Sequence, residues 1–315
     1  MKPGPRLSLR GTPGRGSEKS SRTTVARVAF AALFAGAIGI AFAPIFVRLS
    51  ELGPIATAFY RLALALPILW LWMEIGDRRT ETNRPAGYRD FVGLALSGLL
   101  FAGDLGLWHW SIKLTSVANS TLLVNLAPVF VALGAWLIFG ERFSATFLVG
   151  LVVALAGAAL LVGGSPQISP SHLLGDVLAV AAAVSYAGYI LAVSRLRSRF
   201  STAAVMAYGG GVTCAALLLA ALVSGERLIA STAYGWAVLL GVALISQVGG
   251  QSLIAYALAH LPSAFSSVSL LLQPVAAAIL AWVILGEALG TWQGLGGAVV
   301  LVGIVLARRG SGRPA

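Results

Sequence analysis

The chain has 315 residues, of which 58% are hydrophobic and only 10% are charged. Soluble proteins carry roughly 25% charged residues, so this composition excludes an ordinary soluble domain and predicts an integral membrane protein. The net charge of +11 would suit a nucleic-acid partner, but the basic residues lie between apolar stretches, and we expect no nucleic acid to bind. Cys214 is the only cysteine, which excludes a disulfide within the chain and a cysteine-based metal cluster.

Residues 1–25 form the first segment, which is rich in Gly, Pro, Ser and Arg and has Glu18 as its only acid. This composition predicts a disordered basic tail on the cytoplasmic side of the membrane. An organelle transit peptide has a similar composition and is an alternative. A signal peptide cleaved near Ala43 is a second alternative, which we reject because its removal would take away the first helix and leave nine.

Ten apolar stretches follow, each close to the length of about 20 residues that a membrane-spanning helix needs. The longest connection between them has 16 residues, so no connection holds a soluble domain and the activity must lie within the membrane. We predict an all-α integral membrane protein with helices at residues 28–48, 55–74, 91–111, 117–139, 145–163, 174–194, 203–223, 234–257, 264–285 and 290–308.

The basic residues fall mostly on one side of this predicted bundle. With a cytoplasmic N-terminus, 18 Lys and Arg lie in cytoplasmic segments, Arg48, Lys113 and Arg227 lie in outer loops, and Arg61 lies within a helix. Cytoplasmic loops of membrane proteins carry such an excess. We therefore predict a multi-pass protein of the cytoplasmic membrane with both termini in the cytoplasm.

One unit of the chain occurs twice. Aligned without a gap, residues 118–160 and 264–306 are identical at 16 of 43 positions, including a proline, a tryptophan and a Gly-Glu pair. The copies are five helices apart, and because five is odd they must cross the membrane in opposite directions. We predict two inverted-topology five-helix repeats around a central cavity, the arrangement of secondary transporters. The predicted boundaries are 26–164 for the first repeat, 165–173 for an outer linker, 174–309 for the second repeat and 310–315 for a cytoplasmic tail.

Several stretches carry a resemblance to a known family. WSIKLTSVANSTLLVNLAPVFVALGAWLIFGERFSATFLVGLVVALAGAALLVGG at 110–164 and YALAHLPSAFSSVSLLLQPVAAAILAWVILGEALGTWQGLGGAVVLVGIVLARRG at 256–310 resemble the ends of two EamA units. GDVLAVAAAVSYAGYILAVSR at 175–195 resembles the sixth helix of that family, and FYRLALALPILWLW at 59–72 resembles the second, with Arg61 where the pattern expects an arginine.

Residues 26–309 thus resemble the EamA-type proteins of the drug/metabolite transporter superfamily. The resemblance implies ten helices, an internal pseudo-twofold axis, a central cavity and movement of small metabolites, amino acids or drugs, often outward. It implies no single substrate, because the superfamily also moves nucleotide sugars and phosphorylated sugars. The seventh helix has no arginine that answers to Arg61, so the resemblance implies no symmetric role for that charge.

Pro128 and Pro274 occupy matched positions inside the fourth and ninth predicted helices. Each should kink its helix, because proline removes a backbone hydrogen bond. Polar residues precede each kink, and we interpret them as the lining of a cavity, although they are also suited to hydrogen bonds between helices. The candidates for substrate binding in these two helices are Asn119, Asn125, Ser266 and Gln273.

Arg61 and Asp104 are charges within predicted helices, at similar depth. A charge at bilayer depth costs at least about 2.5–3.5 kcal/mol, so each should face the interior of the bundle and have a partner. Two interpretations stay open. The two residues form a structural salt bridge between helices 2 and 3, or they bind the substrate or a proton.

Four further residues are candidates for substrate binding. Trp108 lies one turn from Asp104 and shares its face, although an interfacial tryptophan also suits a membrane belt. Tyr186 and Tyr189 in helix 6 and Gln251 in helix 8 are suited to substrate binding or to packing with one satisfied hydrogen bond.

The predicted function is a secondary active transporter, an exporter of small metabolites, amino acids or drugs that works by alternating access. The sequence has no metal-ligand spacing and no phosphate-binding loop, so we expect no cofactor, no metal and no direct use of ATP. The alternatives are an intramembrane enzyme, such as a lipid-modifying transferase, and a non-transporting membrane sensor. The expected partners are the lipid bilayer, a small-molecule substrate and, as a candidate coupling ion, the proton, in a monomer or homodimer.

Overall fold

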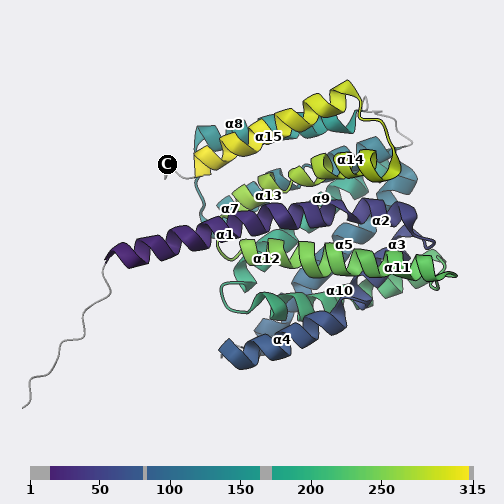
Figure 1. Cartoon of the computed structure of the whole chain (residues 1–315), viewed down its shortest axis with the longest axis horizontal. Helices are drawn as coiled ribbons and strands as arrows, with labels where there is room; N and C mark the ends of the chain where they lie inside the picture. Colours follow the sequence, from purple (N-terminus) through teal and green to yellow (C-terminus); the bar gives the residue numbers. More distant parts are fainter. Residues whose placement is uncertain (1–14, 81–83, 164–171, 312–315) are drawn as a thin grey trace, which may run out of the picture.

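The computed structural model describes residues 15–80, 84–163 and 172–311, and within these ranges every regular element is a helix (Figure 1). In chain order the helices are α1 (Arg15–Ala41), α2 (Ala43–Leu49), α3 (Pro54–Ala63), α4 (Leu66–Thr80), α5 (Tyr88–Leu114), α6 (Val117–Val124), α7 (Ala127–Phe139), α8 (Ala145–Val162), α9 (Leu173–Leu196), α10 (Thr202–Ser224), α11 (Ala233–Gly241), η2 (Val242–Gln251), α12 (Ser252–Ala257), α13 (Ser263–Ser269), α14 (Leu272–Leu285) and α15 (Thr291–Ser311).

Ten helical stretches within the described residues are long and apolar enough to cross a membrane. We number them spans 1 to 10: Thr24–Leu49, Pro54–Gly76, Tyr88–Leu114, Asn119–Phe139, Ala145–Val162, Leu173–Leu196, Thr202–Ser224, Ala233–Ala257, Ser263–Leu285 and Thr291–Ser311. Each overlaps one of the ten predicted helices. The ten-helix prediction is confirmed, and the chain is a multi-pass membrane protein.

Four spans are broken near a proline. Spans 1, 2, 4 and 9 each consist of two helical segments, and Pro44, Pro67, Pro128 and Pro274 lie within the first three residues of the second segment. Proline is tolerated there because the first turn of a helix has no intrahelical acceptor for its N–H groups. Both prolines predicted to kink a helix therefore sit at a break.

Span 8 is irregular without any proline. Its middle segment η2 is a π-helix of 10 residues. π-Helical turns are rare, and those that occur are frequently at functional sites. We did not predict this one from the sequence.

The repeat is visible in the backbone. Gly140 and Gly286 end spans 4 and 9 in the left-handed conformation, with φ of 67° and 71°. The backbone N–H of Glu141 donates to the Ala135 carbonyl, and that of Glu287 donates to the matched Ala281 carbonyl. Only glycine adopts this conformation at little cost, which explains the Gly-Glu pair in both copies. These glutamates thus belong to matched helix-ending turns.

The spans form two central groups between two edges. At one edge α8 and α15 pack along each other, and α10 packs on α3 and α4 at the opposite edge (Figure 1). Between the edges, α5, α6, α7 and α9 bring together spans 3, 4 and 6, which we call the first group. Helices α1, η2, α12 and α14 bring together spans 1, 8 and 9, the second group. Each group therefore mixes spans of both repeats.

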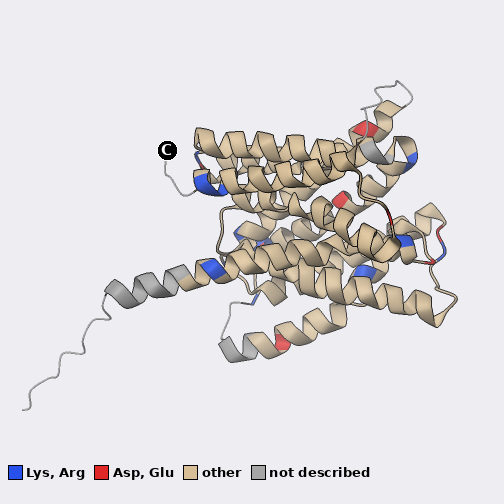
Figure 2. Ribbon diagram, turned by 45° about the horizontal axis from the view of Figure 1, so that its top comes forward, with Lys and Arg blue, Asp and Glu red and all other residues tan. Residues whose placement is uncertain are grey.

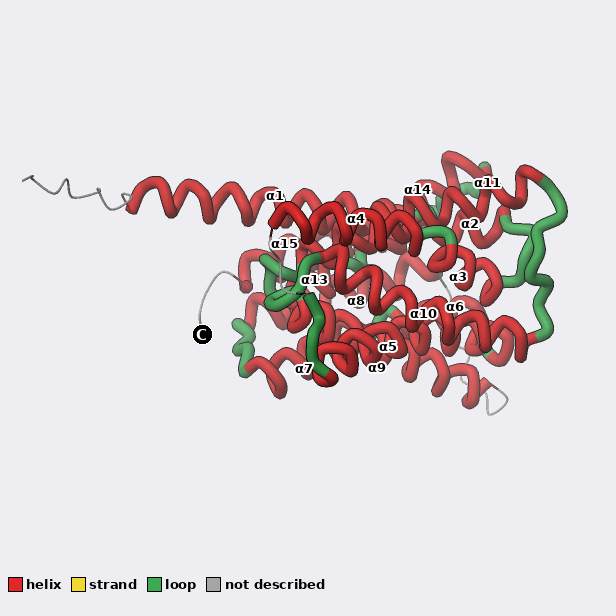
Figure 3. The backbone as a smooth tube through the Cα atoms, turned by 90° about the horizontal axis from the view of Figure 1, so that it is seen from below, coloured by secondary structure: helices red, strands yellow, loops and turns green. Residues whose placement is uncertain are grey.

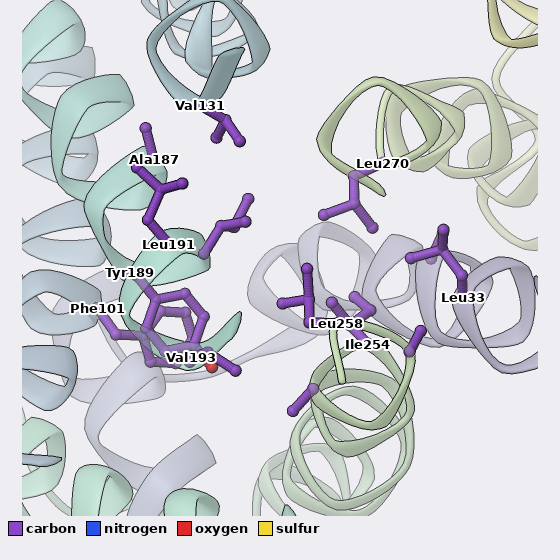
Figure 4. Packing of buried hydrophobic residues seen from close by; sticks show 14 of the residues in the cluster. Leu33, Phe101, Val131, Ala187, Tyr189, Leu191, Val193, Ile254, Leu258 and Leu270 are labelled. Atoms are coloured by element: carbon purple, nitrogen blue, oxygen red, sulfur yellow. The ribbon is translucent and has the colours of Figure 1, made fainter. Parts of the chain in front are cut away.

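Buried apolar side chains of the two groups face each other. Figure 4 shows Val131 and Leu191 from the first group on one side, and Leu258 and Leu270 from the second group on the other. All four side chains are buried.

Both ends of the described chain lie on one side of the bundle (Figure 1), which we call the terminal side, and the opposite side is the far side. The connecting loops gather toward the terminal side and the far side (Figure 3). Most charged residues also lie toward these two sides (Figure 2). This distribution is the one that a bilayer requires, because its apolar core accepts apolar side chains and few charges.

The contact between α8 and α15 depends on glycine. A Cβ atom built on Gly303 would lie 2.3 Å from the backbone nitrogen of Ala154, and one built on Gly150 would lie 2.3 Å from that of Ala307. Small residues let membrane helices approach until their backbones touch. Spans 5 and 10 are thus packing helices, as their glycines predict.

Two predicted boundaries require comment. Residues 15–25, which we predicted to be part of a disordered tail, are helical, because α1 begins at Arg15. After Gly16 this stretch has no glycine or proline to stop the helix, so it continues beyond its apolar part. Residues 1–14, most of the predicted linker at 165–173, and residues 312–315 lie outside the described residues.

A substitution at Gly303 tests the packing of α8 on α15. Gly303→Ala should lower the melting temperature of the detergent-purified protein, because the added methyl group overlaps the Ala154 backbone and overpacking costs about 1–3 kcal/mol. Gly294→Ala is a matched control in the same helix, since a Cβ there has nothing within 4 Å. It should be neutral or slightly stabilising. Equal melting temperatures for the two variants would contradict this packing.

Candidate functional site

Arg61 is a cation held deep in the bundle, with 6% of its surface exposed. It lies on the buried face of α3, beside Thr57, Ala58 and Leu62. Its Nε group donates a 2.9 Å hydrogen bond to Oε1 of Gln247 in η2. Its guanidinium carbon lies 5.6 Å from the centre of the Phe101 ring. The first repeat therefore supplies the charge, and the second supplies its hydrogen-bond acceptor.

Three aromatic rings extend from Arg61 along the contact between α5 and α9. Phe101 and Tyr189 stack with centroids 4.6 Å apart, and Tyr186 lies 6.2 Å from Tyr189 in a nearly parallel plane. Figure 4 shows the overlapping rings of Phe101 and Tyr189. Nε2 of Gln251 donates a 3.0 Å hydrogen bond to the Tyr189 hydroxyl. Both glutamines of η2 thus hold a residue of another helix.

Asp104 lies one turn beyond Phe101 in α5 and is partly exposed. It interacts electrostatically with Arg61, Tyr186 and Tyr189. Among the described residues, however, no ion pair within 4.0 Å joins Asp104 to Arg61. The direct salt bridge is therefore wrong for this conformation. Similar depth made the pair plausible, but Arg61 points to Gln247, which satisfies it without the carboxylate.

We call this set of residues the Arg61 cluster: Arg61, Phe101, Asp104, Tyr186, Tyr189, Gln247 and Gln251. Arg61, Asp104, Tyr186, Tyr189 and Gln251 were predicted from the sequence, whereas Phe101 and Gln247 were not. Gln247 carried a usable signal, because it is a glutamine in an apolar span, four residues before Gln251. Phe101 carried none, since it is one of 13 phenylalanines.

The other predicted residues divide into two sets. Gln273 lies near the Tyr186 hydroxyl and so extends the cluster. Asn125 is the C-cap of α6 at the break in span 4. Both amides have a buried nitrogen without a hydrogen-bond partner among the described residues. Such donors are available to a ligand or to water.

Three predicted residues lie apart from the cluster. The Ser266 hydroxyl donates to the carbonyl of Pro262, one turn earlier in its own helix. The Asn119 backbone N–H is capped by Ser116 at the start of α6, near the far side. The Trp108 ring packs edge-on against His109. No contact in the described structure connects these three residues to Arg61, and their role in binding stays a prediction.

Carboxylates join the two repeats on both sides of the bundle. On the terminal side the Ser263 hydroxyl donates to Glu141, and burial raises the pKa of the Glu141 carboxyl, opposed by this bond. On the far side Glu51 accepts bonds from the Thr232 hydroxyl and the Ser231 N–H, which lower its pKa. A rearrangement that opens the bundle toward either side has to break or carry along such contacts.

The central cavity stays a prediction. Two open surface hollows lie elsewhere. One, of about 420 Å³, is formed by the far-side loop Glu226–Ser231, and the other lies on the outer surface of α15. Within the described residues no group of three or more His, Cys, Asp or Glu side chains is arranged to hold a metal ion.

Comparison with known proteins identifies the family. The sequence pattern of the EamA-like transporter family matches residues 26–163 and 173–309, which lie close to the predicted repeats at 26–164 and 174–309. The chain belongs to the EamA-like transporter family. Its membership rests on both halves of the chain and agrees with the ten spans and the repeated turns.

Individual relatives support this assignment. The chain is 31% identical to a probable terminal-alkyne amino-acid exporter of Streptantibioticus cattleyicolor, over 85% of this chain and 89% of that one. It is 30% identical to the threonine/homoserine exporter RhtA of Escherichia coli, over 70% and 69% of the two chains. A solved crystal structure shares the fold with a TM-score of 0.71 at 19% identity, covering 92% of this chain and 99% of that one.

A double-mutant cycle tests the bond between Arg61 and Gln247. Gln247→Leu should destabilise the protein by about 1.5–3 kcal/mol, because it leaves a buried cation without its acceptor. In an Arg61→Leu background the same substitution should cost much less, since no cation then needs the amide. Unfolding of purified protein by SDS measures both. Ser246→Ala, which removes a separate bond to the Gly39 carbonyl, should cost the same in both backgrounds. Additivity of the Arg61 and Gln247 substitutions within about 0.5 kcal/mol would contradict the bond.

Proposed function

We propose that the chain is a secondary exporter of small metabolites, amino acids among them, and that the Arg61 cluster binds the substrate. The observation that carries the proposal is a 94%-buried arginine (6% exposed) held from both repeats. A buried charge is expensive in a membrane, and such charges mark substrate pathways. Inverted-repeat transporters bind their substrates between the repeats. Two relatives named as amino-acid or threonine/homoserine exporters support the substrate class.

The chemistry of the cluster suits a small zwitterion. Among the described residues, Nε is the only Arg61 nitrogen with a protein hydrogen bond, so the rest of the guanidinium is available to a substrate carboxylate. Asp104 lies in the same electrostatic environment without a salt bridge to Arg61. Its carboxylate is thus available to a substrate ammonium group or to a proton. One cation and one anion at this depth match the two charges of an amino acid.

The energy for export comes, in this proposal, from a proton gradient or from exchange. Acids within the spans other than Asp104, namely Glu74, Asp90 and Asp176, lie near span ends in the described structure. Asp104 is therefore our candidate for the proton-binding residue. The excess of basic residues on the terminal side supports a cytoplasmic position for that side. Alternating access then exposes the cluster to the cytoplasm and to the far side in turn.

Transport in proteoliposomes tests the proposal. Wild-type protein should move radiolabelled L-threonine across a sealed membrane. An inward proton gradient, acid on the far side, should drive this movement. Arg61→Gln should lose most transport because the substrate carboxylate loses its partner. Asp104→Asn should fold and still exchange threonine, but lose its response to pH. Arg48→Gln is a matched control, since Arg48 is an exposed far-side arginine paired with Glu287, and it should keep both activities.

Two results would contradict the proposal. One is full transport by Arg61→Gln with normal affinity. The other is chemical conversion of the metabolite by detergent-solubilised protein, since only transport needs a sealed membrane.

A further inference from the structure

Gln247 has an orientation that its surroundings determine. Its side chain is fully buried at 0% exposure, and its Oε1 accepts the 2.9 Å hydrogen bond from Arg61 Nε. A guanidinium has only donors, so the amide has to turn its oxygen toward Arg61 and its NH₂ group away. The guanidinium thereby removes the usual ambiguity between the two ends of an amide.

The NH₂ group of Gln247 is unpaired in the described part of the chain. Its Nε2 atom is buried and has no hydrogen-bond partner among the described residues. An unpaired donor in a membrane interior is unfavourable and calls for an explanation. A group that binds here at another stage of the transport cycle provides one.

Arg61 presents further donors beside that amide. A guanidinium has five N–H donors, and among the described residues only the one at Nε is bonded to protein. The two neighbouring side chains thus offer several N–H donors. Their one acceptor, Oε1 of Gln247, is already bonded to Arg61. A carboxylate or similar oxyanion accepts such bonds, and an ammonium group does not.

The π-helix explains why an amide sits at this point. Gln247 and Gln251 are four residues apart in η2, close to one π-helical turn, and each bonds to a different helix. On the neighbouring face of η2, α1 approaches so closely that a Cβ on Gly39 would lie 2.9 Å from Gly250 Cα. Packing against α1 therefore fixes the rotation of η2 and turns both amides toward the Arg61 cluster.

We propose that Gln247 and Arg61 together form an oxyanion subsite that takes the carboxylate of the exported metabolite. The inference rests on the proposed function, in that the Arg61 cluster is the substrate site. It adds Gln247 as a specificity-determining residue and restricts the substrates to those with a carboxylate or similar oxyanion. Because Nε2 of Gln247 is buried here, the carboxylate reaches it when η2 and α3 move apart.

The variant Gln247→Glu tests this directly. It is nearly isosteric and places a carboxylate where Oε1 now accepts from Arg61. That carboxylate would pair with Arg61 and occupy the subsite in place of a substrate. The variant should fold at least as stably as the wild type but lose its response to carboxylate ligands.

Binding is measured as the shift in melting temperature of detergent-purified protein with L-threonine, glycine, L-glutamate or acetate, and with L-threoninamide and glycinamide as probes without the carboxylate. Ligands that bind the native state raise the melting temperature. At least one carboxylate probe should bind wild-type protein about tenfold or more tightly than its amide, as for one hydrogen-bonded charge. Gln247→Glu should abolish the difference. Ser246→Ala, the neighbouring substitution in η2, should keep it.

A second variant keeps the test independent of the folding of the first. Gln247→Met has a similar size but no donor, and it should weaken carboxylate binding about tenfold while leaving amide binding unchanged. Equal binding of acids and amides by wild-type protein would overturn the oxyanion subsite, as would absence of any response to carboxylates. An unchanged preference in both Gln247 variants would also overturn it. If the protein then exported a cationic or neutral metabolite in the absence of threonine, the proposed function would stand without this subsite.

Discussion

A cation in an apolar membrane interior needs hydrogen-bond partners, and the arrangement of this protein's centre follows from that requirement at Arg61. The arginine lies on a buried face of α3, where a charge is costly. Its Nε group is satisfied by Gln247 from the other repeat, and its planar guanidinium lies over the Phe101 ring, an arrangement in which a ring face attracts a cation. Without the second repeat, the charge that the first repeat supplies would lose its hydrogen-bond acceptor.

The inverted repeat supplies the frame, but the centre is asymmetric. The backbone symmetry is clear in the turns after Gly140 and Gly286 and in the breaks near Pro128 and Pro274. The chemistry does not follow it. The first repeat contributes Arg61 and Asp104, and the second contributes the tyrosines of α9 and the amides of η2. In the proposed mechanism, symmetric breaks let both halves bend, while one asymmetric set of side chains determines what binds.

The contacts at the two sides of the bundle relate this centre to movement. Glu141 meets Ser263 on the terminal side, and Glu51 meets the start of α11 on the far side. Each contact joins the first repeat to the second. A carboxylate at a helix N-terminus is stabilised by the unpaired N–H groups there, so these contacts are favourable but exposed enough to exchange with water. They are suited to forming on one side while they break on the other.

The sequence predicted the features of this structure that depend on neighbouring residues, and it missed those that depend on contacts between distant segments. Span positions, the repeat and the breaks near Pro128 and Pro274 follow from local composition and backbone chemistry, and they were predicted. The breaks near Pro44 and Pro67 were not predicted. Of the binding candidates, Tyr186, Tyr189, Gln251 and Gln273 lie in or beside the cluster. The salt bridge between Arg61 and Asp104, one of two open interpretations, is not seen among the described residues. Depth along a helix can be read from sequence, but rotation about its axis cannot. The π-helix that turns Gln247 toward Arg61 depends on packing against Gly36 and Gly39, a contact between distant segments with no local signal.

The claim on which the account depends is that the Arg61 cluster opens to each side of the membrane in turn. The direct measurement is labelling of a cysteine at Gln273, in a Cys214→Ala background, with a membrane-impermeant thiol reagent applied to one face of sealed vesicles at a time. The account predicts labelling from each face, with a proton gradient or bound L-threonine shifting reactivity from one face to the other. A cysteine at the bilayer-facing Val302 should resist labelling throughout. Labelling of the Gln273 position from one face only, unmoved by gradient and threonine, would contradict the account.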